Sequence, residues 1–189
     1  MALASLSSLV ETGANSVEKV REVSNVENSK DLPTSNFEGK ESRTNPEAES
    51  RYIICRNESL EGDRHPISGV EFERKTVELP DGSQVEGVFP KFGSKFDALL
   101  DETQFNDSDA KQFKEANGQL KESIENNPEL KEQFTEEQLE QIEAGDTPEG
   151  YVWHHSEEPG ILQLVDITEH AQTGHTGGRS IWGGGSENR

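Results

Sequence analysis

Between residues 70 and 79, hydrophobic residues recur with the two-residue period of a β-strand. Apolar side chains alternate with polar ones at Val70 and Phe72, and again at Val77 and Leu79. The run then meets Pro80-Asp81-Gly82, which has the residue types of a tight turn, and the segment "SQVEGVF" follows. Two β-prone runs joined by such a turn predict a β-hairpin.

From Ser108 the spacing changes to that of a helix, with Ser108 and Asp109 at the position of the cap. The segment "TEEQ" at 135–138 fits a capping box, and it predicts a second helix that ends at Gly145. In the first helix the apolar residues recur every three or four positions and would share one face: Phe113, Ala116, Leu120 and Ile124.

Strand-prone segments return near the C-terminus. "YVWHH" and "ILQLV" are separated by the turn "SEEPG", and Asp166 or Thr168 can cap a short helix that runs to about Gln172. Glycines end this helix, and "GRSIWGGGSENR" reads as a loose tail. The sequence therefore predicts an α+β fold: an upstream hairpin, acidic helices, and a strand–turn–strand–helix unit at about 150–178.

Composition divides the chain into an arm and a domain. Residues 1–50 are rich in Ser, Asn, Glu and Pro, and we expect them to form a flexible arm or linker from a larger protein. Residues 51–189 are expected to form one domain. The single cysteine, Cys55, excludes an intramolecular disulfide, so packing and a metal ion would have to stabilise this domain.

The formal net charge of −20 changes the range of possible functions. Between Asp97 and Glu149 there are 16 acidic and 4 basic residues, so this segment alone has a net charge of −12. A nucleic-acid-binding protein that depends on overall basicity is excluded, because phosphates are repelled by such a surface. A local site could still accept a phosphate if a metal ion or a few arginines supplied positive potential.

Four of the five histidines lie between Gly150 and Gly178. Neutral imidazole is a common ligand for Zn²⁺ and related ions, and a histidine outside the metal shell can act as a general base near neutral pH. His154 and His155 would point to opposite faces of a strand, which favours different tasks for the two. His170 and His175 are five residues apart, so both can bind one ion only if His175 lies beyond the helix.

The order "WHH", "LQLV", His and "HTGG" resembles the WHH group of the HNH/endonuclease VII nuclease superfamily, and the similarity covers roughly residues 63–185. The resemblance implies a ββα-metal fold in which His154, His170 and His175 bind one divalent ion. It also implies that His155 is the general base for phosphodiester hydrolysis. Arg179 is a candidate phosphate contact, whereas His65, Trp153 and Trp182 are expected to be structural.

Several properties follow from this resemblance as expectations. The substrate would be DNA, with RNA as the alternative, and the ion would be Zn, Ni, Mn or Mg, although imidazole ligands suit Mg less well. The chain would be the C-terminal domain of a secreted polymorphic toxin that acts in the cytoplasm of a competing bacterium. A cognate immunity protein would neutralise it, by contact near the active site or with the segment 40–95.

Two other classes of function remain open at this point. A binding module with a closed structural zinc site would use four ligands and would unfold when a chelator removes the ion. An acidic mimic of nucleic acid would use the charge between Asp97 and Glu149, but it would give the histidines no purpose. Replacement of His155 would abolish hydrolysis and leave mimicry intact.

Overall fold

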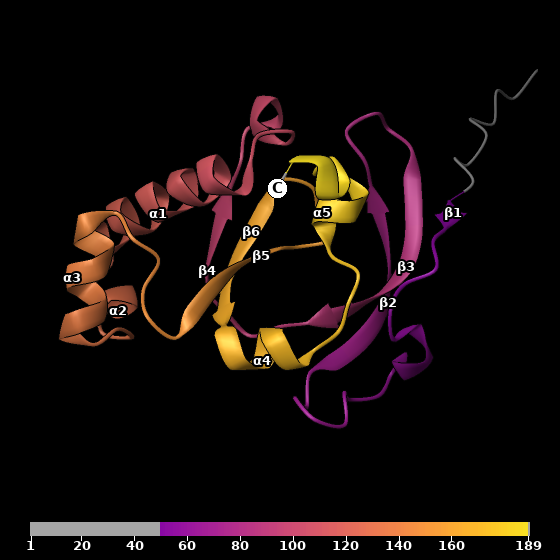
Figure 1. Cartoon of the computed structure of the whole chain (residues 1–189), viewed down its shortest axis with the longest axis horizontal. Coiled ribbons are helices and arrows are strands. Elements are labelled where there is room, and N and C mark those ends of the chain that lie inside the picture. The colour runs from indigo at the N-terminus through magenta and orange to yellow at the C-terminus, as the bar shows by residue number, and fades with distance from the viewer. Residues whose placement is uncertain (1–49, 189) are drawn as a thin grey trace, which may run out of the picture. The chain divides into compact units, whose positions relative to one another are not determined.

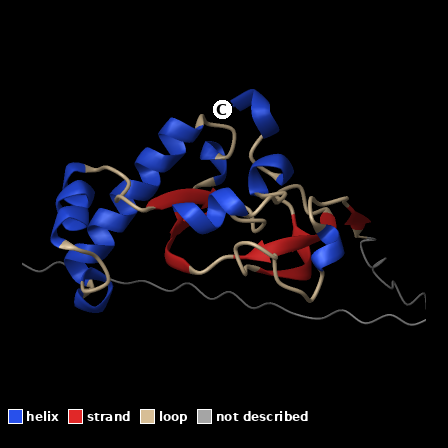
Figure 2. Ribbon diagram, turned by 60° about the horizontal axis from the view of Figure 1, so that its bottom comes forward, coloured by secondary structure: helices blue, strands red, loops and turns tan. Residues whose placement is uncertain are grey.

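The structure is a computed structural model, and it describes residues 50–188. The arm expected over 1–50 therefore lies, apart from Ser50, outside the described residues. The described chain has an α+β fold, as predicted, with two small sheets and a group of helices (Figures 1 and 2). No helix among the described residues combines the length and the apolar character needed to cross a membrane.

The first sheet contains the predicted hairpin. Strand β2 (Glu71–Glu78) pairs antiparallel with β3 (Gln84–Lys91), and the short β1 (Arg51–Tyr52) adds to β3 in parallel. The turn follows the prediction, because the Asp81 carboxylate accepts hydrogen bonds from the Ser83 amide (2.9 Å) and hydroxyl (2.6 Å). Val77, Val85 and Phe89 are buried on one face of the hairpin, and Phe72 and Val88 are buried on the other.

The second sheet carries the predicted ββα unit. Its antiparallel strands lie in the order β4 (Ser94–Leu99), β6 (Ile161–Asp166) and β5 (Tyr151–His155), and helix α4 (Ile167–Gln172) follows β6 directly. The Asp166 carboxylate accepts hydrogen bonds from the amides of Thr168 and Glu169, which starts the helix. Figure 1 shows β5, β6 and α4 next to one another in the middle of the domain.

Three helices lie at the end of the domain away from the hairpin: α1 (Asp109–Asn126), α2 (Pro128–Lys131) and α3 (Glu136–Ala144) (Figure 1). Helix α1 packs against β4 of the second sheet, and α2 and α3 pack against α1. The capping box of Thr135 and Gln138 and the left-handed Gly145 (φ 86°) begin and end α3 as predicted. Ser108 is the N-cap residue of α1, but its side chain makes no capping hydrogen bond. The shared core contains Ala116, Leu120, Ile124, Ile142, Trp153, Leu162 and Leu164.

The expectation of a loose tail after the last glycines is wrong. Residues Gly178–Ile181 form helix α5, and a 3₁₀ turn covers Gly185–Asn188; similar turns cover Glu58–Leu60 and Glu102–Gln104. Trp182 is buried, and its indole Nε1 donates a hydrogen bond to the Ser156 carbonyl (2.9 Å). Contact with a distant segment therefore orders this stretch, although its own sequence has no strong preference for helix or strand.

Candidate active site

Three histidines meet at the junction of β5, β6 and α4. His154 comes from β5, His170 from α4 and His175 from the loop after α4, and one ring nitrogen of each lies within 4.8 Å of the others. The five-residue spacing is accommodated because α4 ends at Gln172 and Thr173 is extended (φ −100°, ψ 96°). The backbone after Thr173 then brings His175 back to the cluster. His175 thus lies beyond the helix, which is the condition for it to share an ion with His170.

The tautomer of His175 is set by the backbone. Its Nδ1 lies 2.7 Å from the carbonyl oxygen of Thr173, and a carbonyl can only accept, so Nδ1 carries the proton. The Nε2 lone pair of the neutral ring is then left to bind an ion. The Thr173 hydroxyl lies within hydrogen-bonding distance of the Glu169 carbonyl and of the Ser68 hydroxyl, which in turn contacts His65. His65 thus lies outside the cluster, behind the loop that supports it.

One aromatic ring and one glycine shape the cluster. The Phe92 ring lies against all three imidazoles, with centroid distances of 4.9 Å to His154, 5.5 Å to His170 and 5.2 Å to His175. A Cβ atom on Gly177 would lie 3.0 Å from the His155 carbonyl and 3.2 Å from the His154 ring. Glycine at this position therefore lets the loop close over the histidines.

The electrostatics of the cluster favour uncharged imidazoles. Burial, reinforced by the other histidines, holds the pKa of His154 well below its usual value, and burial beside His175 lowers the pKa of His170 to about 4. Burial also lowers the pKa of His175. The Nε2 atom of His154 is buried and has no hydrogen-bond partner. Three neutral imidazoles with a buried, unsatisfied nitrogen among them fit a divalent metal ion.

His155 contacts a different set of side chains from His154, as expected for neighbours on a strand. Its Nε2 lies 2.7 Å from the Oε1 of Gln112, and the rings of Phe113 and Trp182 lie 5.6 Å from its centroid. Asp109 Oδ1 is 3.8 Å away. The two adjacent histidines therefore share a pocket without sharing partners.

Arg179, the candidate phosphate contact, lies beside His155 and is buried. Its guanidinium contacts the Asp109 carboxylate (3.1 Å), the Oε1 of Gln112 (3.1 Å) and the carbonyl of Asp107 (3.3 Å). A buried guanidinium requires a compensating charge, and Asp109 supplies it. The arginine is thereby fixed at the edge of the histidine site.

Asp109 and Gln112 were not predicted as site residues. Asp109 has the residue type of a helix start, and Gln112 is polar, so both read as parts of a solvated helix. One signal was present: Gln112 precedes Ala116 by four residues, which places it on the apolar stripe of α1 with Leu120. A polar residue on a buried stripe needs partners, and here they are His155 and Arg179.

An ion pair joins the hairpin to the segment after His155. Glu157 is buried, and its Oε1 accepts a hydrogen bond from the Lys75 ammonium on β2 (2.6 Å). The amide of Arg56 donates to the Thr176 hydroxyl (3.0 Å), and the Asn57 side chain donates to the Gly174 carbonyl (2.7 Å). Residues upstream of the hairpin turn thus hold the loop that carries His175.

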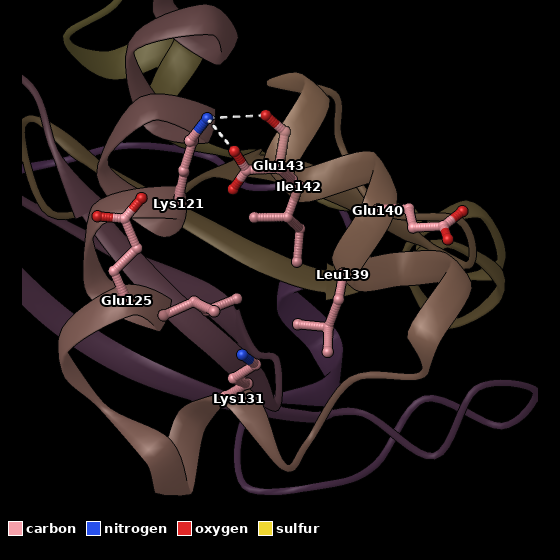
Figure 3. A pocket seen from close by; sticks show the side chains of 8 residues that line it. Lys121, Glu125, Lys131, Leu139, Glu140, Ile142 and Glu143 are labelled. Carbon is pink, nitrogen blue, oxygen red and sulfur yellow. Dashed lines mark hydrogen bonds and ion pairs between the residues drawn. The ribbon is translucent and has the colours of Figure 1, made fainter.

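The three clustered histidines, His155 and Arg179 line one pocket of about 280 Å³ between α1, β5, α4 and α5. A larger hollow of about 410 Å³ lies between α1 and α3, and Figure 3 shows its lining. Its lining residues include no histidine, and Lys121 is paired there with the carbonyl and carboxylate of Glu143. The groups capable of acid–base chemistry are in the smaller pocket, which is lined by Asp109, Phe113, Trp153, His154, His155, His170, His175, Gly177, Arg179 and Ser180.

Comparison with known proteins gives one match. The model of a family described as the DNase/tRNase domain of colicin-like bacteriocin matches residues 81–177. This stretch contains β3–β6, the helices α1–α4 and all four clustered histidines. No curated protein and no solved structure matches the chain.

Proposed function

Because the chain belongs to the family of DNase/tRNase domains of colicin-like bacteriocins, we propose that it is a metal-dependent endonuclease that cleaves DNA in competing bacteria. At the level of the family it is a nuclease toxin domain of the bacteriocin type. The metal dependence, the preference for DNA and the HNH-type assignment of residues to tasks are parts of the proposal.

The observation that carries the proposal is the pairing of two histidine environments in one pocket. His154, His170 and His175 form a cluster of ligand atoms, and His155 lies beside it with a different partner, Gln112. A closed structural zinc site would use a fourth protein ligand. Among the described residues the cluster offers three, which is the number of protein ligands typical of catalytic zinc sites.

Each residue then has a task in phosphodiester hydrolysis. His154, His170 and His175 hold the ion, which when bound supplies positive charge for the phosphate and the leaving oxygen. His155 takes a proton from the attacking water, the water oxygen forms the new bond to phosphorus, and the bond to the leaving oxygen breaks. Arg179, which pairs with Asp109 and lines the pocket, would contact a phosphate oxygen through its guanidinium.

The ligand type favours some divalent ions over others. Imidazole nitrogens suit Zn²⁺ and Ni²⁺, and they suit Mn²⁺ and Mg²⁺ less well, since these ions favour oxygen ligands. The described structure supplies imidazoles from all three positions. We therefore expect Zn²⁺ or Ni²⁺ to bind most tightly, and weaker binding of Mn²⁺ and Mg²⁺.

The toxin assignment also implies a secreted protein and a protective partner. A nuclease that is free in the producing cell would cut the cell's own genome, so a cognate immunity protein is part of the proposal. In the segment 40–95, the other contact surface considered for this partner, two basic residues are paired with nearby carboxylates: Arg74 pairs with Glu61 and Glu86, and Lys75 pairs with Glu157. The pocket rim, where an inhibitor would block substrate, is therefore the better contact surface.

Incubation of the protein with plasmid DNA and with total RNA tests the proposal. Zn²⁺, Ni²⁺, Mn²⁺ and Mg²⁺ are each added in turn, and EDTA and the His155→Ala variant serve as controls. We expect plasmid cleavage that requires a metal ion and His155. Cleavage of RNA alone would reverse the substrate assignment, and cleavage that is unchanged by EDTA would exclude a metal-dependent enzyme.

A further inference from the structure

Gln112 is a fully buried amide in the first turns of α1, on the stripe that otherwise holds apolar side chains. A buried amide is costly unless its oxygen and both of its N–H groups find partners. Gln112 meets this requirement with two backbone carbonyls on one side and two site residues on the other. The side chain therefore links the backbone before α1 to the chemistry of the pocket.

The orientation of this amide is determined by what its neighbours can donate. The Nε2 of Gln112 lies 2.8 Å from the carbonyl of Gln104 and 2.9 Å from that of Phe105. Carbonyl oxygens only accept, so the NH₂ group must face them. The Oε1 atom must then face the other side, where the guanidinium of Arg179, which can only donate, lies 3.1 Å away.

The same oxygen fixes the proton on His155. The Nε2 of His155 lies 2.7 Å from the Oε1 of Gln112, and an amide oxygen can only accept, so Nε2 has to carry the hydrogen. In a neutral imidazole the other nitrogen, Nδ1, then bears the lone pair. The amide thus selects one of the two neutral tautomers of His155.

We propose that Gln112 is the positioning residue of this nuclease, because it holds neutral His155 in the Nε2–H tautomer so that Nδ1 receives the proton of the attacking water. The inference rests on the proposed function of His155 as the base. The Oε1 atom of Gln112 also accepts a hydrogen bond from Arg179. One amide therefore fixes the position of the His155 ring and that of the guanidinium beside it. A shift of α1 would move both groups together.

The tautomer can be measured without any activity. Full-length protein labelled with ¹⁵N-histidine is examined by NMR at a pH where His155 is neutral, and the His155 signals are identified by their loss in His155→Ala. We expect the protonated nitrogen to be Nε2 in the wild-type protein. A wild-type His155 protonated at Nδ1 would overturn the proposal, whatever the variants do.

Two substitutions separate positioning from folding. In Gln112→Met the accepting oxygen is lost, and the expected result is a mixture of tautomers with kcat lowered about 10- to 100-fold, as for other supporting residues of metal sites. Metal affinity should not change, because Gln112 bonds none of the three ligand candidates. Gln112→Glu keeps an accepting oxygen beside His155, so it should retain the wild-type tautomer and most of kcat at a pH where His155 remains neutral.

Gln119→Met is the matched control, because Gln119 lies on the same helix and bonds the backbone of Leu99, away from the pocket. It should leave the tautomer and kcat unchanged. A Gln112→Met protein with the wild-type tautomer and full kcat would contradict the proposal. If the wild-type protein cleaves neither DNA nor RNA, the proposed function fails, while the NMR measurement still decides the role of Gln112.

Discussion

His154 and His155 are adjacent in the chain, yet their side chains contact different sets of residues. His154 packs against Phe92 and the other two ligand candidates, while His155 bonds Gln112 beneath Trp182. Strand geometry separates neighbouring side chains in this way. The two positions are therefore suited to a comparison of otherwise identical substitutions.

Alanine at His154 is expected to weaken metal affinity and activity together, because it removes a ligand. Alanine at His155 should leave the metal bound and lower activity by about 10²–10⁴-fold, the usual contribution of a general base. Calorimetric titration with Zn²⁺ beside a cleavage assay measures both effects. Loss of metal binding in His155→Ala with retention in His154→Ala would reverse the two roles.

Gly178 shows how close the chain passes to itself next to this site. A Cβ atom there would collide with the Ser156 carbonyl and with the Trp182 indole. Gly178→Ala is therefore expected to lower the free energy of unfolding by about 1–3 kcal/mol, the range for overpacked positions. Urea denaturation of the metal-free protein measures the change.

Gly118→Ala provides the matched control for this substitution. Gly118 lies on the exposed side of α1, and nothing comes within 4 Å of a Cβ atom added there. Since alanine favours helix over glycine by about 1 kcal/mol, this variant should be more stable than the wild-type protein. Equal effects of the two substitutions would mean that Gly178 is not closely packed.

At the level of elements, the short helix α4 depends on its cap. It has six residues, and the Asp166 carboxylate bonds two of its first amides. Asp166→Ala should cost about 1 kcal/mol of stability, and it should also reduce Zn²⁺ affinity, since His170 is carried on this helix. Asp101→Ala removes a comparable cap from the turn Glu102–Gln104, so it should affect stability without changing metal affinity.

The elements that the sequence predicts correctly are those with local signals. Turn residues at Pro80-Asp81-Gly82, the capping box at 135–138 and the cap at Asp166 act within a few residues of themselves. Helix α5 has no such signal, because its side chains are ordered by partners far away in the chain. Arg179 bonds Gln112, 67 positions earlier, and Trp182 bonds Ser156, 26 positions earlier.

The residues of the candidate site also differ in whether a local signal in the sequence predicts them. Clustering of histidines in a short segment, together with the resemblance of "WHH" and "HTGG" to a nuclease group, predicts His154, His155, His170 and His175 as site residues. The structure brings all four to one pocket, and their roles stay predictions. The supporting residues Asp109 and Gln112 come from a separate helix, and only the tertiary fold brings them to His155. Spacing along the chain contains little information about such contacts.

For the whole molecule, the lowered histidine pKa values link stability to pH. An unfolded histidine binds a proton near pH 6.5, whereas His170 in the folded state does so at about 4. Between these values the unfolded state binds more protons, so stability falls as the pH decreases. The metal-free protein should therefore unfold at lower urea concentration at pH 5 than at pH 8.

His170→Asn should reduce this dependence on pH, because it removes one of the groups whose proton is bound only on unfolding. Urea midpoints at pH 8, 7, 6 and 5 give the slope for both proteins. A wild-type midpoint that stays constant from pH 8 to pH 5 would be inconsistent with buried neutral histidines. Added Zn²⁺ should raise the midpoint at pH 8, since the ion binds the folded state.

The acidic side chains of α1 and α3 differ in number between the two hollows of the domain. The carboxylates of α1 and α3 surround the larger hollow, with Glu125, Glu140 and Glu143 at its edge (Figure 3). The histidine pocket instead contains one carboxylate, Asp109, paired with Arg179. The net charge of −20 is therefore not concentrated in the pocket that we propose to bind nucleic acid.

The contacts of Ser68 with Thr173, of Lys75 with Glu157 and of Arg56 with Thr176 have an evolutionary consequence. The family match begins at residue 81, after all three upstream partners. Toxin genes that exchanged only the matched segment by recombination would acquire the histidines. They would lack the upstream side chains that contact the segments next to these histidines. Breakpoints that yield active chimaeras should therefore fall before Arg56, so that the exchanged segment is longer than the matched one.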